Sequence, residues 1–119
     1  GLLVEGEQLI VASWGTMTDG FATKIPGHMK TININTKKIN SLGDKSAIGN
    51  LDGLESDGNG NYFVTDWMTG KLLYITAEGL SKTLVALEQG SADHTIIPEQ
   101  KLIIIPMMLT NKLIAFKIK

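Results

Sequence analysis

Two aspartates hold equivalent places in a repeated pattern and are the first candidates for chemistry. Asp52 stands directly before one predicted strand, and Asp93 begins another. If both strands line a central opening, the two carboxylates face it together and could hold a divalent cation such as Ca²⁺ or Mg²⁺, which prefer oxygen ligands. The alternative is that each aspartate only caps a turn through its side chain. The residues alone leave both interpretations open.

The segment Gly15–His28 is the second candidate, because it departs from the repeat. It joins two predicted strands that the next unit connects with only Met68–Gly70. Long loops on a rigid scaffold often carry function, so we expect this loop to cover the opening, with Asp19, Phe21 and His28 as contact residues. A plain insertion is the alternative, and a lone histidine is more often structural than catalytic.

Two tryptophans complete the candidate site. Trp14 and Trp67 end the second strand of their units, at the position where the third unit has Met107. This recurrence favours a packing role, although both side chains fall at the mouth of the predicted opening. No nucleophile motif competes with the carboxylates, since Gly90–Ala92 lacks the G-x-S-x-G pattern.

An internal repeat organises these residues. Trp14, Trp67 and Met107 lie 53 and 40 residues apart, close to the length of a propeller blade. Apolar, β-branched and aromatic runs between turn residues indicate hairpins rather than helices. The predicted strands are 1–6, 8–14, 29–35, 38–42, 53–58, 61–67, 71–76, 82–87, 93–98, 101–107 and 112–118. The predicted fold class is all-β: β-propeller blades of four-stranded antiparallel sheets, about half of a six-bladed propeller.

The chain is predicted to be a single domain of three blades. Their approximate ranges are 1–45, 46–90 and 91–119, and the last blade lacks its outer strand. Asp57–Gly60 is a strong tight-turn signal, because Gly and Asn adopt positive φ at little cost. This segment is not a calcium loop of the EF-hand type, which needs a later bidentate glutamate.

Strand direction brings the candidate residues together. Neighbouring strands are antiparallel, so the first strand of each blade begins at the rim where the second strand ends. Asp52, Asp93, Trp14, Trp67 and the loop Gly15–His28 then surround one opening.

Three blades cannot close a ring, and they leave two apolar faces exposed to water. We expect a second copy to complete a six-bladed homodimer, with missing N-terminal blades as the alternative. The unfinished third blade also presents an open strand edge, which favours association.

Composition excludes several classes of function. The 119 residues are 43% hydrophobic and 19% charged, as in a globular domain with a core. A net charge of -1 offers no basic field for nucleic acid. The absence of cysteine excludes disulfides, thiolate zinc sites and a cysteine nucleophile. No apolar run approaches the roughly 20 residues that span a bilayer, and no signal peptide is visible, so we expect no membrane partner; the compartment stays undetermined.

The sequence NLDGLESDGNGNYFVTDW, residues 50–67, resembles a blade of the regucalcin/gluconolactonase-like six-bladed propellers, and the likeness extends over all three units. The resemblance implies a lactonase-like site with one divalent metal on the axis, calcium first, with magnesium, zinc and manganese as alternatives. It implies that Asp52 is both metal ligand and base. The family's Asn ligand would stand before Gly1, its Glu ligand belongs to blades outside this sequence, and Asp93 has no counterpart.

Two functions follow as hypotheses. The first is a metal-dependent lactonase or esterase-like hydrolase acting on a small molecule, inactive if this fragment lacks part of the site. In it, the metal polarises the carbonyl and Asp52 activates water. The second is a non-catalytic propeller module that binds a small ligand or a protein at its mouth. The third hypothesis is that the chain is a truncated relic of a propeller that assembles but has no activity.

Overall fold

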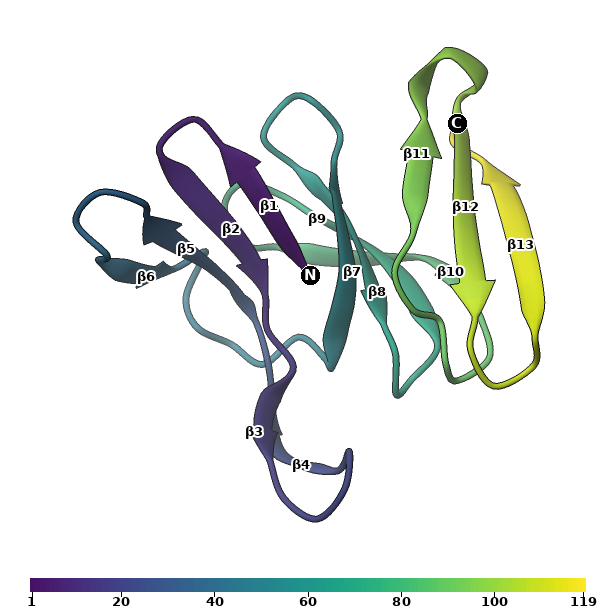
Figure 1. Ribbon diagram of the computed structural model, residues 1–119, viewed down its shortest axis with the longest axis horizontal. Helices are drawn as coiled ribbons and strands as arrows, with labels where there is room; N and C mark the ends of the chain where they lie inside the picture. The colour runs from purple at the N-terminus through teal and green to yellow at the C-terminus, as the bar shows by residue number, and fades with distance from the viewer.

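The structure is a computed structural model that describes residues 1–119. Its strands form four antiparallel sheets, none of them closed, and its one helical segment is the 3₁₀ turn Pro98–Gln100 (Figure 1). The prediction of an all-β fold built from antiparallel hairpins is therefore confirmed. The structure contains no helix that combines the length and apolar character needed to cross a bilayer.

The first sheet is formed by the N-terminal third of the chain. It contains β1 (Leu2–Glu5), β2 (Gln8–Ala12), β5 (Met29–Asn33) and β6 (Ile39–Ser41), paired in that order. Gly6, with a φ of 56°, makes the tight turn between β1 and β2. The side-chain oxygen Oδ1 of Asn33 accepts bonds from the amides of Asn35 and Thr36, at 3.0 and 2.8 Å, and shapes the turn after β5.

The second sheet uses four consecutive strands. These are β7 (Leu51–Ser56), β8 (Tyr62–Asp66), β9 (Lys71–Ile75) and β10 (Ser81–Ala86), and each pairs with the next along the chain. Asp57 Oδ1 accepts bonds from the amides of Asn59 and Asn61, at 2.7 and 3.1 Å. The predicted turn between β7 and β8 is confirmed by these bonds, since they are those of an Asx turn.

The third sheet has three strands. It contains β11 (Thr95–Ile97), β12 (Leu102–Met107) and β13 (Lys112–Lys117), with the 3₁₀ turn between β11 and β12. The first two sheets have an outer strand at the corresponding edge, β6 and β10, whereas β13 has no neighbour there.

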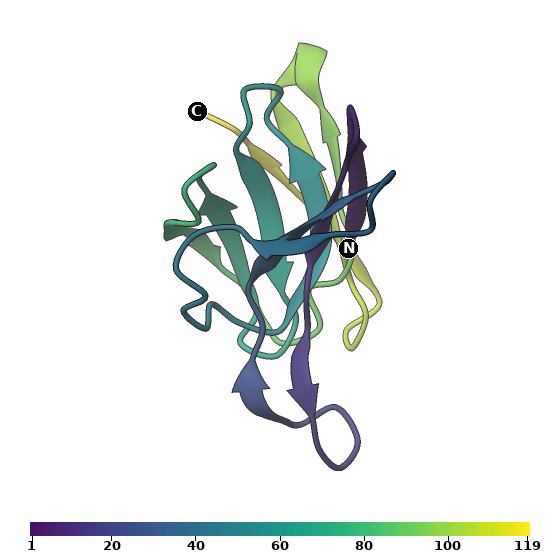
Figure 2. The ribbon, with the colours of Figure 1, turned by 90° about the vertical axis from the view of Figure 1, so that its left-hand side faces the viewer.

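The expected loop Gly15–His28 is instead mostly a β-hairpin, and that part of the prediction is wrong. Strands β3 (Gly15–Met17) and β4 (Thr23–Pro26) pair in an antiparallel ladder. Figure 2 shows this insertion hairpin extending below the sheets. The segment is too short and mixed in composition to reveal its pairing by alternation, so the sequence indicated only a connection.

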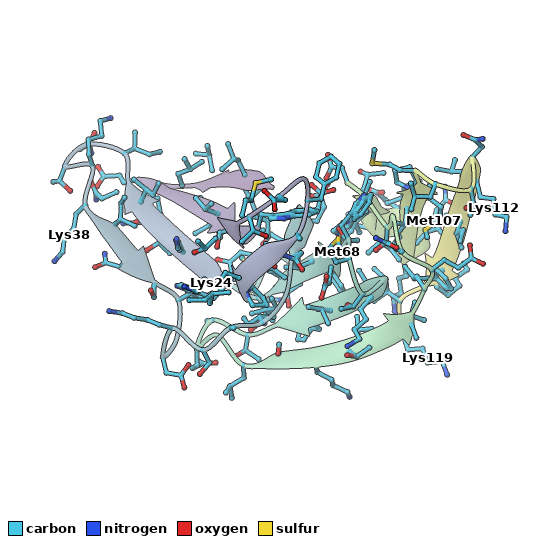
Figure 3. The ribbon with its side chains drawn as sticks, turned by 90° about the horizontal axis from the view of Figure 1, so that it is seen from below. Lys24, Lys38, Met68, Met107, Lys112 and Lys119 are labelled. Atoms are coloured by element: carbon cyan, nitrogen blue, oxygen red, sulfur yellow. The ribbon has the colours of Figure 1, made fainter.

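Two apolar layers hold the three sheets together, and the second sheet lies between the other two. Strand β8 is buried along its whole length, with Tyr62 and Val64 facing the first sheet and Phe63 facing the third. The first layer contains Ile10, Ala12, Met29, Leu51, Leu54, Tyr62, Val64, Leu73 and Ile75, and the second contains Phe63, Leu72, Ile103, Ile105 and Met107. Figure 3 shows the three sheets following an arc.

The two end sheets each bury only one face. On the far face of the first sheet, cross-strand neighbours bring together Leu2, Val4, Leu9, Val11, Ile32 and Ile39. Leu2 is 67% exposed and Val4 is 64% exposed. The far face of the third sheet carries Pro106 opposite Leu113, which is 71% exposed. Large apolar faces of this kind mark sites of association.

Candidate functional site

The inner strands β1, β7 and β11 all begin at one end of the molecule, where β2, β8 and β12 end (Figure 1). We call this end the rim. Backbone hydrogen bonds connect it: the Trp67 amide donates to the Asn50 carbonyl at 3.0 Å, and the Gly90 amide donates to the Trp67 carbonyl at 2.9 Å. The prediction that strand ends alternate between two rims is confirmed.

Asp52 and Asp93 lie at this rim and influence each other. Asp52 is partly buried and Asp93 is exposed. Burial raises the pKa of Asp52; the amino group of Gly1 opposes that rise, and the negative charge of Asp93 adds to it. A carboxyl group in this environment gains from any positive charge that binds beside it.

Glu55 is a third carboxylate of this cluster, and the sequence did not predict its place there. It lies on β7, and its pKa is raised by burial first and by Asp93 second, while the hydroxyl of Thr95 opposes the rise. A β-bulge between Leu51 and Leu54 changes the alternation of side chains along β7. With the bulge in place, the negative charge of Asp93 raises the pKa of both Asp52 and Glu55. In a regular strand, side chains three residues apart point to opposite faces. The spacing of Asp52 and Glu55 in the sequence therefore did not predict that both belong to one cluster.

The donor set does not complete a metal site within one chain. Asp52 and Asp93 offer carboxylate oxygens, but the structure contains no group of three or more His, Cys, Asp or Glu side chains placed to hold one ion. A calcium ion requires six to eight oxygen ligands. Further ligands would have to come from outside these residues, and no catalytic step through a metal follows from this arrangement.

The predicted mouth residues Trp14, Phe21 and Trp67 form one aromatic cluster. The ring centroids are 6.2 Å apart for Trp14 and Phe21, 5.9 Å for Phe21 and Trp67, and 5.8 Å for the two tryptophans. Trp14 Nε1 donates to the Phe21 carbonyl at 3.2 Å, which ties the tip of the insertion hairpin to the rim. Phe21 remains 66% exposed, so the cluster presents an aromatic surface to solvent.

The third unit contributes Met108 to this surface rather than Met107. Met107, which shares the repeat position of the tryptophans, is buried in the second apolar layer. Trp67 Nε1 lies 3.3 Å from Met108 Sδ, and Met108 is 62% exposed. The exposed surface at the rim therefore includes Met108 beside the aromatic cluster. Methionine is a flexible side chain that adapts to varied ligands.

Asn50 anchors the insertion hairpin to the second sheet. Its side-chain Nδ2 donates to the Trp14 carbonyl at 3.0 Å and to Thr23 Oγ1 at 2.9 Å. Its backbone amide in turn donates to Asp66 Oδ1. The aromatic surface is thus held by polar contacts of a buried side chain, and no sequence motif marks either Asn50 or Asp66.

Asp19 and His28 are not part of the carboxylate cluster. Asp19 is exposed in the turn at the tip of the insertion hairpin, where its carbonyl accepts a bond from the Ala22 amide. His28 Nε2 lies 2.9 Å from Ser41 Oγ on the outer strand β6, so the ring turns toward the edge opposite β1. Burial lowers the pKa of His28, and Lys30 and Lys45 lower it further.

The other histidine, His94, directly precedes β11. It is buried, and neither ring nitrogen makes a hydrogen bond of normal geometry. Burial lowers the pKa of His94 to about 4, which Asp93 and the backbone of Phe63 oppose only in part. The ring packs against Gly53 of β7, where a Cβ atom would come within 2.6 Å of His94 Nδ1. A neutral His94 therefore acts as packing between the inner strands.

Comparison with known proteins adds no family to this description. No protein-family model matches the chain, and no curated protein sequence matches it. The assignment of function therefore depends on the geometry of the rim.

Proposed function

We propose that the three sheets are blades of a six-bladed β-propeller and that the rim binds a small cationic ligand. The fold part is supported by three consecutive sheets whose first strands β1, β7 and β11 all begin at the rim. The molecule measures 40 × 39 × 21 Å, so it is half as deep as it is wide, as expected for half of a disc. The arc of the three sheets in Figure 3 is also that of half a disc.

A second copy would complete the ring. In each chain the second sheet already packs between two others through aliphatic and aromatic side chains. Placing the far face of the third sheet against the far face of a partner's first sheet repeats this packing. Two such contacts related by a two-fold axis close a ring of six sheets and cover both exposed apolar faces.

Solution mass tests this closure. We expect light scattering to give twice the 12.9 kDa of one chain. Changing Leu113→Asp should shift the mass to that of a monomer, because a charge in a buried apolar interface is strongly unfavourable. The exposed Leu80, outside both far faces, offers the control variant Leu80→Asp, which should leave the dimer intact. A monodisperse monomer of the unaltered chain would disprove ring closure by a second copy.

The binding proposal depends on one observation: the partly buried carboxylates of Asp52 and Glu55 lie within the influence of the exposed Asp93. Burial raises the pKa of both groups and the charge of Asp93 adds to the rise, while at Asp52 the amino group of Gly1 opposes it. A bound cation would relieve that repulsion. Electron-rich faces of Trp14 and Trp67 at the same rim would add cation–π attraction and cover the apolar part of the ligand. A small organic amine combines a positive charge with an apolar part.

Binding of butylamine, charged at neutral pH, is the direct test, with butanol as the uncharged control ligand. We expect butylamine to change tryptophan fluorescence and butanol to bind at least about tenfold more weakly, because charge-assisted bonds are the stronger ones. Asp52→Asn should weaken amine binding about five- to tenfold by the same reasoning. Binding should also weaken on acidification, since protonation of Asp52 and Glu55 removes the attraction.

Glu99→Gln is the matched control variant for this assay. Glu99 is an exposed carboxylate in the 3₁₀ turn at the opposite end of the third sheet, so its loss should leave amine affinity unchanged. Equal binding of butylamine and butanol, or equal effects of the two substitutions, would show that the rim carboxylates do not recognise a cation.

A metal-dependent lactonase or esterase is the second candidate, favoured by the resemblance of residues 50–67 and by the position of Asp52 at the start of β7 on the rim. Its missing ligands would have to be supplied by the second copy or by further blades. The same titration separates the candidates. Binding of Ca²⁺ without butylamine binding, with lactone hydrolysis that Asp52→Asn abolishes, would support the hydrolase instead.

A further inference from the structure

The outer edge of the third sheet is an unpaired strand. The first two sheets contain four strands each, and their outer strands β6 and β10 pair antiparallel with the preceding strand. Strand β13 occupies the edge of a three-stranded sheet, and its only partner is β12. An unpaired edge presents a row of free amide and carbonyl groups that can pair with another strand.

The direction of those groups follows from the pairing with β12. The Ile118 amide donates to the Lys101 carbonyl, and Pro106, which lies opposite Leu113, has no amide to donate. Amide direction alternates along a strand. Leu113, Ala115 and Lys117 therefore direct their backbone N–H groups away from β12, toward the free edge.

An apolar groove runs beside this edge. Its volume is about 650 Å³, and eight of its eleven lining residues are hydrophobic. Leu84 and Val85 of β10 form one wall, while Phe116 and Ile118 of the third sheet form the other. Leu84 is 43% exposed. A strand added beside β13 would place every second side chain over these residues and cover them.

The charges along β13 identify the kind of strand that fits. Lys112 and Lys117 are its first and last residues, and Lys119 follows. Lys117 and Lys119 line the groove, with Asp57 as its one acidic residue. Lys117 Nζ also donates to the Gln100 carbonyl at 3.2 Å. Antiparallel pairing of β13 with its own copy would bring lysines together, which is unfavourable. An acidic strand has the complementary charge.

We propose that β13 binds an extended acidic peptide segment of another protein by antiparallel strand addition. Apolar residues of the peptide enter the groove at alternate positions, and carboxylates between them face Lys117 and Lys119. Main-chain bonds to Leu113, Ala115 and Lys117 supply affinity, and the groove and lysines supply specificity. This site is separate from the rim, and closing a six-sheet ring leaves it open.

A capped synthetic peptide of about eight residues, alternating valine and glutamate, is the probe, since strands of this length are common. Hydrogen exchange should show new protection of the amides of Leu113, Ala115 and Lys117 when the peptide is added. A peptide of alternating valine and lysine should bind about tenfold more weakly, given several cross-strand charge pairs.

Ala115→Pro is the decisive variant, because it removes an outward amide that the fold does not use and proline is tolerated at such edge positions. It should weaken peptide binding at least about fivefold, the value of one lost hydrogen bond. Ala115→Val keeps the amide and should bind normally. If Ala115→Pro does not fold, Lys117→Glu should weaken binding of the acidic peptide and strengthen that of the basic one.

Three outcomes would overturn the proposal. These are the absence of binding by the acidic peptide, normal binding by a folded Ala115→Pro variant, and protection at β6 or β10 in place of β13. Protection of the β13 amides that rises with protein concentration in the absence of peptide, measured on the Leu113→Asp variant so that ring closure does not contribute, would also overturn it, because the edge would then be occupied by a second copy.

Discussion

Replacing Asp66 with alanine should lower the free energy of unfolding by about 4 kcal/mol, because three hydrogen bonds to a buried carboxylate are lost together. Asp66 is 2% exposed at the end of β8. Its Oδ1 accepts bonds from the amides of Asn50 and Thr69, at 3.3 and 3.2 Å, and its Oδ2 accepts from Thr69 Oγ1 at 2.6 Å. Alanine would leave all three donors without this acceptor.

The effect of this change should extend to the rim. Asn50 holds the insertion hairpin through its side chain, so a disturbed Asn50 backbone would also displace Trp14. Urea unfolding followed by tryptophan fluorescence measures both the loss of stability and the change in the aromatic cluster.

Asp66→Asn is the matched variant, and it should cost only about 1 kcal/mol, the value of a typical single hydrogen bond. Its side-chain oxygen can still accept from the two amides, and its amide can donate to Thr69 Oγ1. Equal destabilisation by alanine and asparagine would contradict the proposed role, because it would show that the bonds to Oδ1 contribute nothing.

Replacing Gly53 with alanine should cost about 3 kcal/mol, the upper part of the usual range for overpacking a filled site. A Cβ at this position would lie 2.6 Å from His94 Nδ1 and 2.9 Å from both the Ala92 carbonyl oxygen and the Asp93 Cα. Two of these three contacts are with backbone, so the segment leading to β11 would have to move away from β7. The spacing of Asp52 and Asp93 would change with it.

Two comparisons isolate the steric cause. Gly58→Ala, in the exposed turn where a Cβ meets nothing within 4 Å, should cost only about 1 kcal/mol for its positive φ. His94→Ala should relieve part of the clash, so the double variant should lose less stability than the sum of the two single variants. Strictly additive losses in thermal unfolding would show that Gly53 and His94 do not share a packed site.

The strands and their turns were predictable from sequence because they depend on local chemistry. Asp57–Gly60 combines an Asx side chain with two glycines, and the structure forms the expected turn there. The alternation of antiparallel strands then placed Asp52, Asp93 and the two tryptophans at one rim without knowledge of the packing. These inferences need only neighbours in the chain or in the same hairpin.

Other parts of the site depend on contacts between distant segments. The insertion hairpin pairs residues whose composition has no clear period, and its docking depends on Asn50, 27 residues beyond the Thr23 hydroxyl that it contacts. Glu55 joined the carboxylate cluster because of a bulge, and His28 turned toward Ser41. None of these contacts leaves a local signal in the residue order.

Hydrophobic alternation and turn residues act over a few neighbouring positions, so residue order alone was enough to predict an antiparallel all-β chain. The side chains that share the rim, the uncovered faces of the end sheets and the strand edge without a partner became known only from the folded chain. The reason is physical: burial, electrostatic coupling and backbone pairing between sheets depend on distances in space, and residue order constrains these distances only through the completed packing.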